Sequence, residues 1–430
     1  MIQLRKACLA LVGLALLALI AGLVAGNPAL WQPAAVTAAV ALAIGLGATP
    51  SLKGYQYTAW IIAAVVAAMI YPAAFLKVGD FDLRNKWVIL VVVQLVMFGM
   101  GTQMSLRDFA GVMKNPWGVF IAVAGQFLIM PLSGWTLTRI FPLPDEIAAG
   151  VILIGCCSSG LASNVMCYIA RANLALSITA TSMTTLLAPL MTPLWMKILA
   201  GTLVEIKFLG MMTEIIKIVI VPIAAALIHD HLKNGGADRR QKWTVAQAIS
   251  AAAMIAIFAT RDASWMLAQP NPVQLLYELA GFACGAVAVG VTYHQLTLVF
   301  PRLDSLMPLV SMSGIVYFTT VTTAAGRDNL LLVGALLFVV AVLHNAAGYF
   351  FGYWAARAAR LDRASCRTVA IEVGLQNGGM ASGLAGAMGK LATVGLAAAI
   401  FSPWMNISGS ILANHWKRRP VDDVGKPPTP

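Results

Sequence analysis

Long apolar stretches, separated by short polar or glycine- and proline-containing breaks, run through almost the whole chain. A helix of about 20 apolar residues crosses the roughly 30 Å hydrocarbon core of a bilayer. The pattern therefore predicts fourteen membrane-spanning segments, of which 245–260 is short and ends at Arg261-Asp262. The predicted segments are 7–25, 31–48, 56–76, 87–104, 116–140, 146–170, 174–199, 206–229, 245–260, 273–299, 306–325, 329–356, 366–389 and 391–414.

Composition agrees with an all-α polytopic membrane protein. Hydrophobic residues make up 60% of the chain and charged residues only 11%, whereas soluble domains carry about 25%. The net charge of +12 would suit a nucleic-acid partner, but the basic residues lie in the breaks between apolar runs. That distribution is typical of topology signals, so we expect the lipid bilayer as a partner, no nucleic acid and no protein partner.

The charged breaks predict the orientation in the membrane. Basic stretches occur at 233–242, 357–367 and 416–420, whereas 80–86 and 326–329 are mixed or acidic. Because cytoplasmic loops carry the excess of Lys and Arg, we expect a cell (inner) membrane protein with both termini in the cytoplasm. This orientation requires that both segments within 243–299 cross the bilayer.

The first apolar run and the cysteines add two expectations. Arg5 and Lys6 precede a run of apolar residues at 7–25, as in a signal peptide, but the run is long enough to span the bilayer. We expect an uncleaved first helix. The six cysteines form no spaced pair and mostly lie in apolar runs, which predicts neither a disulfide framework nor a zinc site.

A weak internal repeat links the two halves of the chain. The stretches "GLASNVM" (160–166) and "GLQNGGM" (374–380) each place polar residues just after Gly-Leu, in the middle of a predicted span. One span earlier, "GQFLIMPLSGW" (125–135) and "HNAAGYFFGYW" (344–354) share a polar amide and a later Gly-aromatic pair. The predicted topology runs corresponding spans in opposite directions, which is typical of inverted repeats in secondary transporters.

Glu372 is the acidic residue that we expect deep inside a span, with no Lys or Arg at similar depth. A carboxylate there costs several kcal/mol unless it has a partner, which leaves a proton or a bound cation. Gly374 and Gly378 follow it, and Gly155 and Gly160 occupy the repeat counterpart. Such glycines weaken a helix, and unwound carbonyls with Ser, Thr, Asn and Gln oxygens suit an alkali cation. The alternative is a neutral core acid among interhelical hydrogen bonds.

The sequence resembles the bile acid:sodium symporter family in four motif regions. These regions are "FGMGTQMSLRDF" (98–109), 161–194, 343–362 and "RTVAIEVGLQNGGMASGLA" (367–385). The resemblance implies a ten-helix transporter core of two inverted five-helix repeats (5+5), two crossing discontinuous helices and about four extra helices.

The implied boundaries divide the chain into five parts. They are an extra N-terminal transmembrane hairpin (1–50), the first repeat plus the first helix of the second (56–230), an inserted transmembrane hairpin (243–299), the remainder of the second repeat (301–416) and a cytoplasmic tail (417–430).

The resemblance also implies two Na⁺ sites that share Glu372. The ligands implied for the first are Ser163, Asn164, Ser177, Thr181 and Glu372, and those for the second are Gln126, Glu372, Gln376 and the backbone carbonyls of Val373 and Leu375. The i,i+4 spacing of Ser177 and Thr181 places both hydroxyls on one helix face.

The same resemblance places the substrate near Leu161, Ala162, Asn377 and Asn406. Many relatives have Pro-Gly-Gly-Thr where this chain has Ser158-Ser159-Gly160-Leu161, and Met405 stands where some relatives have His. Both differences make the expected pocket more apolar. We therefore expect a small monoanion with an apolar body, such as a monocarboxylate or a bile-acid-like molecule.

Two functional hypotheses follow. The first is Na⁺-coupled symport of an organic anion by alternating access. The second is a uniporter or proton-coupled exporter similar to arsenite permeases, for which Cys156 or Cys157 would supply a thiolate. We expect no enzyme, because the spans contain no nucleophile–base pair or acidic dyad. We interpret His344-Asn345 as the repeat counterpart of Gly125-Gln126.

Overall fold

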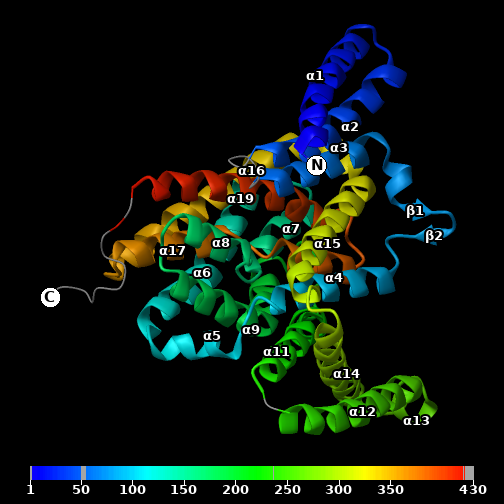
Figure 1. The fold of residues 1–430 in the computed structure, drawn as a ribbon, viewed down its shortest axis with the longest axis vertical. Coiled ribbons are helices and arrows are strands. Elements are labelled where there is room, and N and C mark those ends of the chain that lie inside the picture. The colour runs from blue at the N-terminus through cyan, green and yellow to red at the C-terminus, as the bar shows by residue number, and fades with distance from the viewer. Residues whose placement is uncertain (1, 50–54, 236, 420, 422–430) are drawn as a thin grey trace.

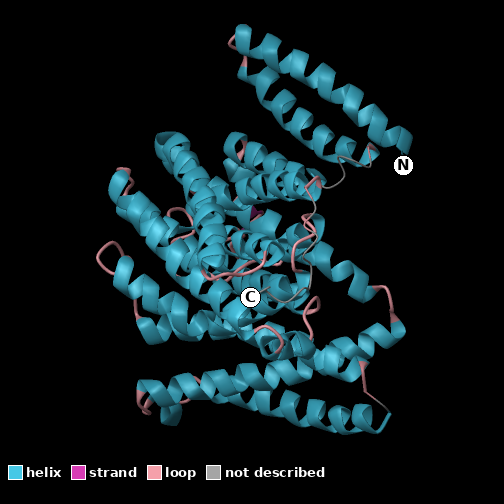
Figure 2. Cartoon of the chain, turned by 90° about the vertical axis from the view of Figure 1, so that its left-hand side faces the viewer, coloured by secondary structure: helices cyan, strands magenta, loops and turns pink. Residues whose placement is uncertain are grey.

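The structure is a computed structural model that describes residues 2–49, 55–235, 237–419 and 421. Most of the predicted tail 417–430 therefore lies outside the described residues. Helices dominate the described part of the chain (Figure 2). A small antiparallel hairpin of β1 (Lys77–Val78) and β2 (Phe81–Asp82) joins two of them.

The helices follow the predicted apolar segments closely. In chain order they are α1 (Ile2–Val24), α2 (Pro28–Gly45), α3 (Gln56–Ile70), α4 (Lys86–Gly101), α5 (Leu106–Ala110), α6 (Pro116–Ile140), α7 (Asp145–Cys156), α8 (Ala162–Ile169), α9 (Leu174–Leu199), α10 (Phe208–Ile215), a π-helical turn (Ile216–Ile220), α11 (Val221–Lys233), α12 (Ala237–Thr260), α13 (Ser264–Leu267), α14 (Asn271–Val299), α15 (Leu303–Ala325), α16 (Arg327–Ala358), α17 (Arg363–Gly374), α18 (Gly378–Ala387) and α19 (Val394–Lys417). Short 3-10 turns at Leu46–Ala48, Pro72–Phe75 and Gly111–Met113 extend three of them.

The described residues contain 10 helices that are long and apolar enough to cross a membrane. The remaining predicted segments correspond to the shorter helix α3, to α4 and to the two broken pairs α7–α8 and α17–α18. Helix α4 bends by 64° into α5. The chain is therefore an all-α polytopic membrane protein, as predicted. The segment predicted at 245–260 is part of the longer α12, so the inserted hairpin begins before residue 243.

Two helical hairpins lie at opposite ends of the molecule (Figure 1). Helices α1 and α2 pack along each other and reach the rest of the chain through α3. At the other end, α12 packs on α14, and α14 packs on α11. They lie in the stretches 1–50 and 243–299, where we expected transmembrane hairpins, and the five-part division of the chain stays a prediction. Helices α7, α8 and α17 lie between the two hairpins (Figure 1).

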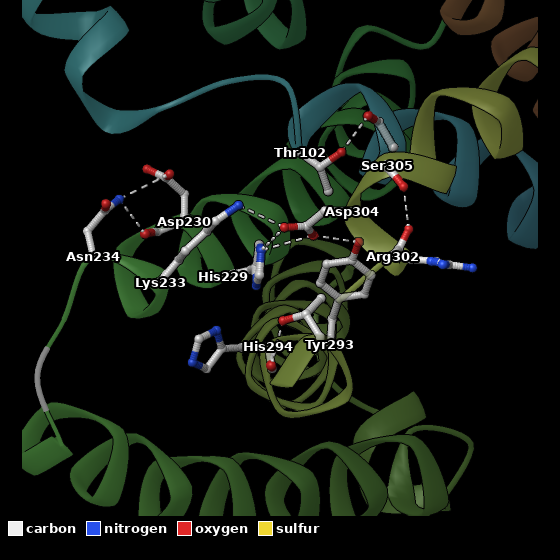
Figure 3. A network of polar contacts seen from close by, with 12 residues as sticks. Thr102, His229, Asp230, Lys233, Asn234, Tyr293, His294, Arg302, Asp304 and Ser305 are labelled. Atoms are coloured by element: carbon white, nitrogen blue, oxygen red, sulfur yellow. Dashed lines mark hydrogen bonds and ion pairs between the residues drawn. The ribbon is translucent and has the colours of Figure 1, made fainter. Parts of the chain in front are cut away.

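Polar contacts around Asp304 fasten the inserted hairpin at one end (Figure 3). Asp304 lies in the first turn of α15 and accepts a hydrogen bond of 2.9 Å from the Tyr293 hydroxyl of α14. Lys233 Nζ lies 2.8 Å from its Oδ2, and His229 Nε2 lies 3.2 Å from its Oδ1. The carboxylate thus joins α11, α14 and α15.

A partly buried ion pair also joins α14 to α10 and the π-helical turn. Lys217 lies in the π-helical turn with only 7% of its surface exposed. Its Nζ lies 3.1 Å from Glu214 of α10 and 3.0 Å from Glu278 of α14. The sequence analysis expected an acidic residue deep in a span only at Glu372, with no Lys or Arg at similar depth, and it did not anticipate this ion pair. The charges are tolerated because they pair with each other.

Candidate functional site

The breaks in the two discontinuous helices cross each other and pair through their backbones. The Gly160 N–H donates to the Leu375 carbonyl at 3.1 Å, and the Asn377 N–H donates to the Ser158 carbonyl at 2.9 Å. A Cβ atom on Gly160 would lie 2.7 Å from the Gln376 carbonyl oxygen, so this close approach requires glycine. Each break therefore satisfies backbone groups that unwinding the other has freed, as non-helical backbone at membrane depth requires.

The residues predicted for the first ion site meet in one cluster. Glu372 is 1% exposed, and its Oε1 and Oε2 accept hydrogen bonds from Ser177 Oγ at 2.5 Å and Thr181 Oγ1 at 2.8 Å. Asn164 Oδ1 lies 2.8 Å from Ser177 Oγ, and Ser163 Oγ lies 3.3 Å from Thr181 Oγ1. Helix α9 thus presents both hydroxyls on one face, as their spacing predicted.

The hydroxyl groups around Glu372 carry fewer protons than the acceptor oxygens that they face. The Ser177 hydroxyl carries one proton, yet it lies within hydrogen-bonding distance of both Glu372 Oε1 and Asn164 Oδ1. The Thr181 hydroxyl likewise faces Glu372 Oε2 and Asn164 Oδ1, the latter at 3.4 Å. The cluster therefore holds more acceptor oxygens than its hydroxyl protons can serve. Hard oxygen donors with one carboxylate match the chemistry that an alkali cation prefers.

The residues predicted for the second site form an adjoining chain of hydrogen bonds. Gln126 Nε2 of α6 donates to Gln376 Oε1 at 2.7 Å, and Gln376 Nε2 donates to the Val373 carbonyl at 2.7 Å. The Leu375 carbonyl accepts the backbone hydrogen bond that joins the two breaks. The Glu372 carbonyl accepts from Ser159, and its carboxylate faces the hydroxyls of the first cluster, so its part in the second site stays a prediction.

Sequence reasoning missed Ser159 and the role of Asn345. Ser159 is fully buried, and its hydroxyl donates to the Glu372 carbonyl at 2.9 Å. Asn345 Nδ2 of α16 donates to the Gly374 carbonyl at 2.8 Å, where α17 ends. Gln126 Nε2 donates in the same way, at 2.9 Å, to the Cys157 carbonyl, where α7 ends. The sequence analysis paired Gln126 with Asn345 as repeat counterparts, which was the available signal for this role. The inverted repeat itself stays a prediction.

The residues predicted around the substrate border the start of α18. Asn377 Oδ1 accepts the Met380 N–H at 3.0 Å and so caps α18. Asn406 Nδ2 of α19 donates to the Ser402 carbonyl at 2.7 Å. A Cβ atom on Gly378, the first residue of α18, would lie 2.0 Å from Ser402 Oγ. The α18 terminus is thus capped from within, a feature that the sequence analysis did not anticipate.

The apolar residues of the predicted pocket lie at the other broken helix and on α19. Leu161 and Ala162 are half-buried at the start of α8, and Met405 is buried on α19. Helix α19 packs against both α8 and α18. The predicted substrate residues therefore belong to three neighbouring helices.

Comparison with known proteins identifies the family. A model of the Sodium Bile acid symporter family matches residues 90–269. The uncharacterized sodium-dependent transporter YocS of Bacillus subtilis is 33% identical over 85% of this chain and 92% of its own length.

More distant relatives have transport functions in their names. The probable chloroplastic sodium/metabolite cotransporter BASS1 of Oryza sativa is 26% identical over 86% of this chain and 74% of its own length. The human ileal sodium/bile acid cotransporter is 27% identical over 67% of this chain and 66% of its own length. The chain therefore belongs to the sodium bile acid symporter family, and it is a sodium-dependent transporter rather than an enzyme.

Proposed function

We propose that this protein couples the entry of Na⁺ to the uptake of a small organic anion by alternating access. The observation that carries the proposal is the position of Glu372, which is buried among side-chain oxygens where two broken helices cross. A proton on Glu372 would supply one donor, whereas a cation at the centre of the cluster interacts favourably with all of its oxygens. This advantage favours Na⁺ over a neutral acid.

Two Na⁺ ions fit two sets of oxygen donors. The first set consists of the Glu372 carboxylate with the neighbouring hydroxyls of α9 and the side chains of Ser163 and Asn164. The second set is the chain formed by Gln126, Gln376 and the Val373 carbonyl, to which the proposal adds the Leu375 carbonyl and Glu372. Small displacements of the Gln126 and Gln376 side chains would free their oxygens for an ion.

The substrate proposed here is a monoanion with an apolar body. The starts of α8 and α18 supply the positive ends of two helix dipoles, which favour a negative charge. Asn377 uses its Oδ1 to cap α18 and one amide N–H to reach Ser158 Oγ at 3.5 Å, which leaves its second amide N–H to bind an anion. Leu161 and Met405 add apolar surface. The expected pocket therefore suits a monocarboxylate or a bile-acid-like molecule better than a hydroxyl-rich acid.

The proposed setting is a cell inner membrane with both termini in the cytoplasm. Its support is the excess of Lys and Arg in the breaks that would face the cytoplasm, such as 357–367. Symport then carries Na⁺ and the anion inward, down the sodium gradient.

Thermal unfolding of the purified protein tests the ion part of the proposal. Na⁺ should raise the midpoint temperature relative to K⁺ or choline at equal ionic strength, because a ligand that binds only the folded state stabilises it. Glu372→Gln keeps the side-chain shape, removes the charge and should abolish this shift. Glu205→Gln, at an exposed carboxylate, is the control and should keep it. An unchanged sodium shift in Glu372→Gln would contradict the proposal.

Uptake into proteoliposomes tests the substrate part. An inward Na⁺ gradient should drive accumulation of labelled monocarboxylates with apolar bodies, and unlabelled monocarboxylates should compete. Preferential transport of neutral or cationic solutes would overturn the assignment, because helix termini and amide N–H groups favour anions.

A further inference from the structure

Asn345 belongs to a buried chain of hydrogen bonds that runs from the end of α17 to α19. Its Nδ2 donates to the Gly374 carbonyl at 2.8 Å, and its Oδ1 accepts from Ser408 Oγ of α19 at 2.6 Å. Ser408 Oγ also lies 3.1 Å from the Tyr349 hydroxyl of α16. Asn345 itself is 1% exposed, so both ends of its amide make these hydrogen bonds away from bulk solvent.

The peptide that Asn345 holds lies inside the proposed second ion site. Gly374 separates Val373 from Leu375, the two residues whose carbonyls we propose as ligands. The Leu375 N–H donates to the Ile371 carbonyl at 3.0 Å. The peptide unit between Gly374 and Leu375 is thus held at its N–H by α17 and at its C=O by Asn345. This double anchor sets the direction of the carbonyl groups on either side.

Tight packing leaves the same peptide little freedom to move. A Cβ atom on Gly374 would lie 2.2 Å from the ring of Tyr349, and one on Gly348 would lie 2.8 Å from Gly374 Cα. A Cβ atom on Gly409 of α19 would lie 3.2 Å from the Tyr349 hydroxyl. Helices α16 and α19 therefore enclose the end of α17, and the hydrogen-bond chain spans the enclosed region.

Helix α19 contacts Asn345 and also carries a residue of the proposed substrate site. Ser408 anchors Asn345, and two residues earlier the same helix carries Asn406, which we propose at the substrate. The Ser408 hydroxyl also lies 3.2 Å from the Met405 carbonyl, so it is bound to the backbone beside the proposed pocket. A displacement of α19 would thus act on Asn345 directly.

We propose that Asn345 is a positioning residue for the second sodium site and that Ser408 of α19 holds it in place. Asn345 does for α17 what Gln126 does for α7, since each amide fixes the carbonyl at which a half-helix ends. Gln126 is itself a proposed sodium ligand, whereas Asn345 acts on the site through the Gly374 carbonyl and is also hydrogen-bonded to α19. The inference rests on the proposed function, and it adds a residue pair outside the ligand set.

Asn345→Ala tests the role of the amide. The Na⁺ concentration that gives half of the maximal thermal shift should rise by at least about fivefold, which is the size expected for losing one buried hydrogen bond. Asn329→Ala is the matched control, because Asn329 also lies on α16 and donates to a backbone carbonyl, that of Ala392, at 3.2 Å. The control should lower the midpoint temperature equally in Na⁺ and choline, with an unchanged half-saturating Na⁺ concentration.

Ser408→Ala and Tyr349→Phe test whether Ser408 and its neighbour Tyr349 hold the Asn345 amide in place. They test the positioning role even if Asn345→Ala does not fold. Ser408→Ala keeps the Gly374 contact but frees the Asn345 amide to rotate, so we expect a rise of about two- to threefold in half-saturating Na⁺. Tyr349→Phe should act in the same direction. Because Ser408 acts through Asn345, the double variant Asn345→Ala/Ser408→Ala should have the same half-saturating Na⁺ concentration as Asn345→Ala alone.

The outcomes separate the two proposals. A wild-type protein without any sodium shift would refute the proposed function and this inference together. A normal wild-type shift, with Asn345→Ala and Ser408→Ala indistinguishable from Asn329→Ala in half-saturating Na⁺, would overturn the positioning role alone.

Discussion

Ser177 donates a hydrogen bond of 2.5 Å to Glu372, although 195 residues separate them in the chain. The donor lies near the start of α9, and the acceptor lies near the end of α17, just before the helix breaks. Packing α9 against α17 therefore assembles the candidate ion site. The contact also explains how a carboxylate remains at membrane depth, because hydroxyl donors partly replace its lost hydration.

Ser177→Ala should weaken Na⁺ binding. The substitution removes one oxygen and leaves Glu372 Oε1 without its shortest hydrogen bond. We expect about a tenfold rise in the half-saturating Na⁺ concentration of the thermal shift. Ser182→Ala is the matched control, because Ser182 is also buried on α9 but donates to the Ile178 carbonyl of its own helix. Equal effects of the two substitutions would argue against Ser177 as a ligand.

Gly374→Ala should be strongly destabilising. Its Cβ atom would lie 2.2 Å from the Tyr349 ring, so the ring or α17 must move. We expect a loss of about 1–3 kcal/mol in unfolding free energy, as for other overpacked sites. Gly334→Ala, where the nearest atom would be 3.8 Å away, should be neutral or stabilise α16 by about 0.5–1 kcal/mol. Thermal unfolding in detergent measures both, and a tolerated Gly374→Ala would contradict the packing.

Asp304→Asn should loosen the inserted hairpin. The amide removes the negative charge that faces Lys233 and His229. It also replaces one of the two carboxylate oxygens of Asp304, whose Oδ1 accepts from Tyr293, by an NH₂ donor. We expect a loss of about 1–3 kcal/mol, together with faster proteolysis of the connection between α11 and α12. Asp328→Asn serves as the control, because that carboxylate is 92% exposed and exposed pairs contribute little. Matching results for the two variants would refute the role of Asp304.

Labelling with a membrane-impermeant thiol reagent tests the topology. A cysteine at Ala268, in the exposed turn between α13 and α14, should react from outside the cell. A cysteine at Asn234, at the exposed end of α11, should react only after the membrane is opened. The wild-type protein gives the background of its own thiols. Reaction of both positions from one side would show that the inserted hairpin does not cross the bilayer.

Local pattern was sufficient to predict the helices and their breaks. Each span follows from a run of apolar residues, and each break follows from glycines near residues 160 and 374, because a residue without Cβ weakens a helix. The pairing of Ser177 with Thr181 on one helix face also follows from helical period alone. The prediction that Glu372 needs a partner followed from its expected depth in a span and from the cost of desolvating a carboxylate.

Only the tertiary structure decided which partners these groups find. Lys217 lies within a span because Glu278 of α14 reaches it, and no local pattern reveals a pairing between distant helices. In the same way, Asn345 meets the Gly374 carbonyl only where α16 packs closely on the end of α17. The sequence alone thus determined where the chain spans, where it breaks and where a charge needs a partner. Packing decided the identity of each partner, because hydrogen bonds and ion pairs act over a few ångströms and those distances exist only once the helices have assembled.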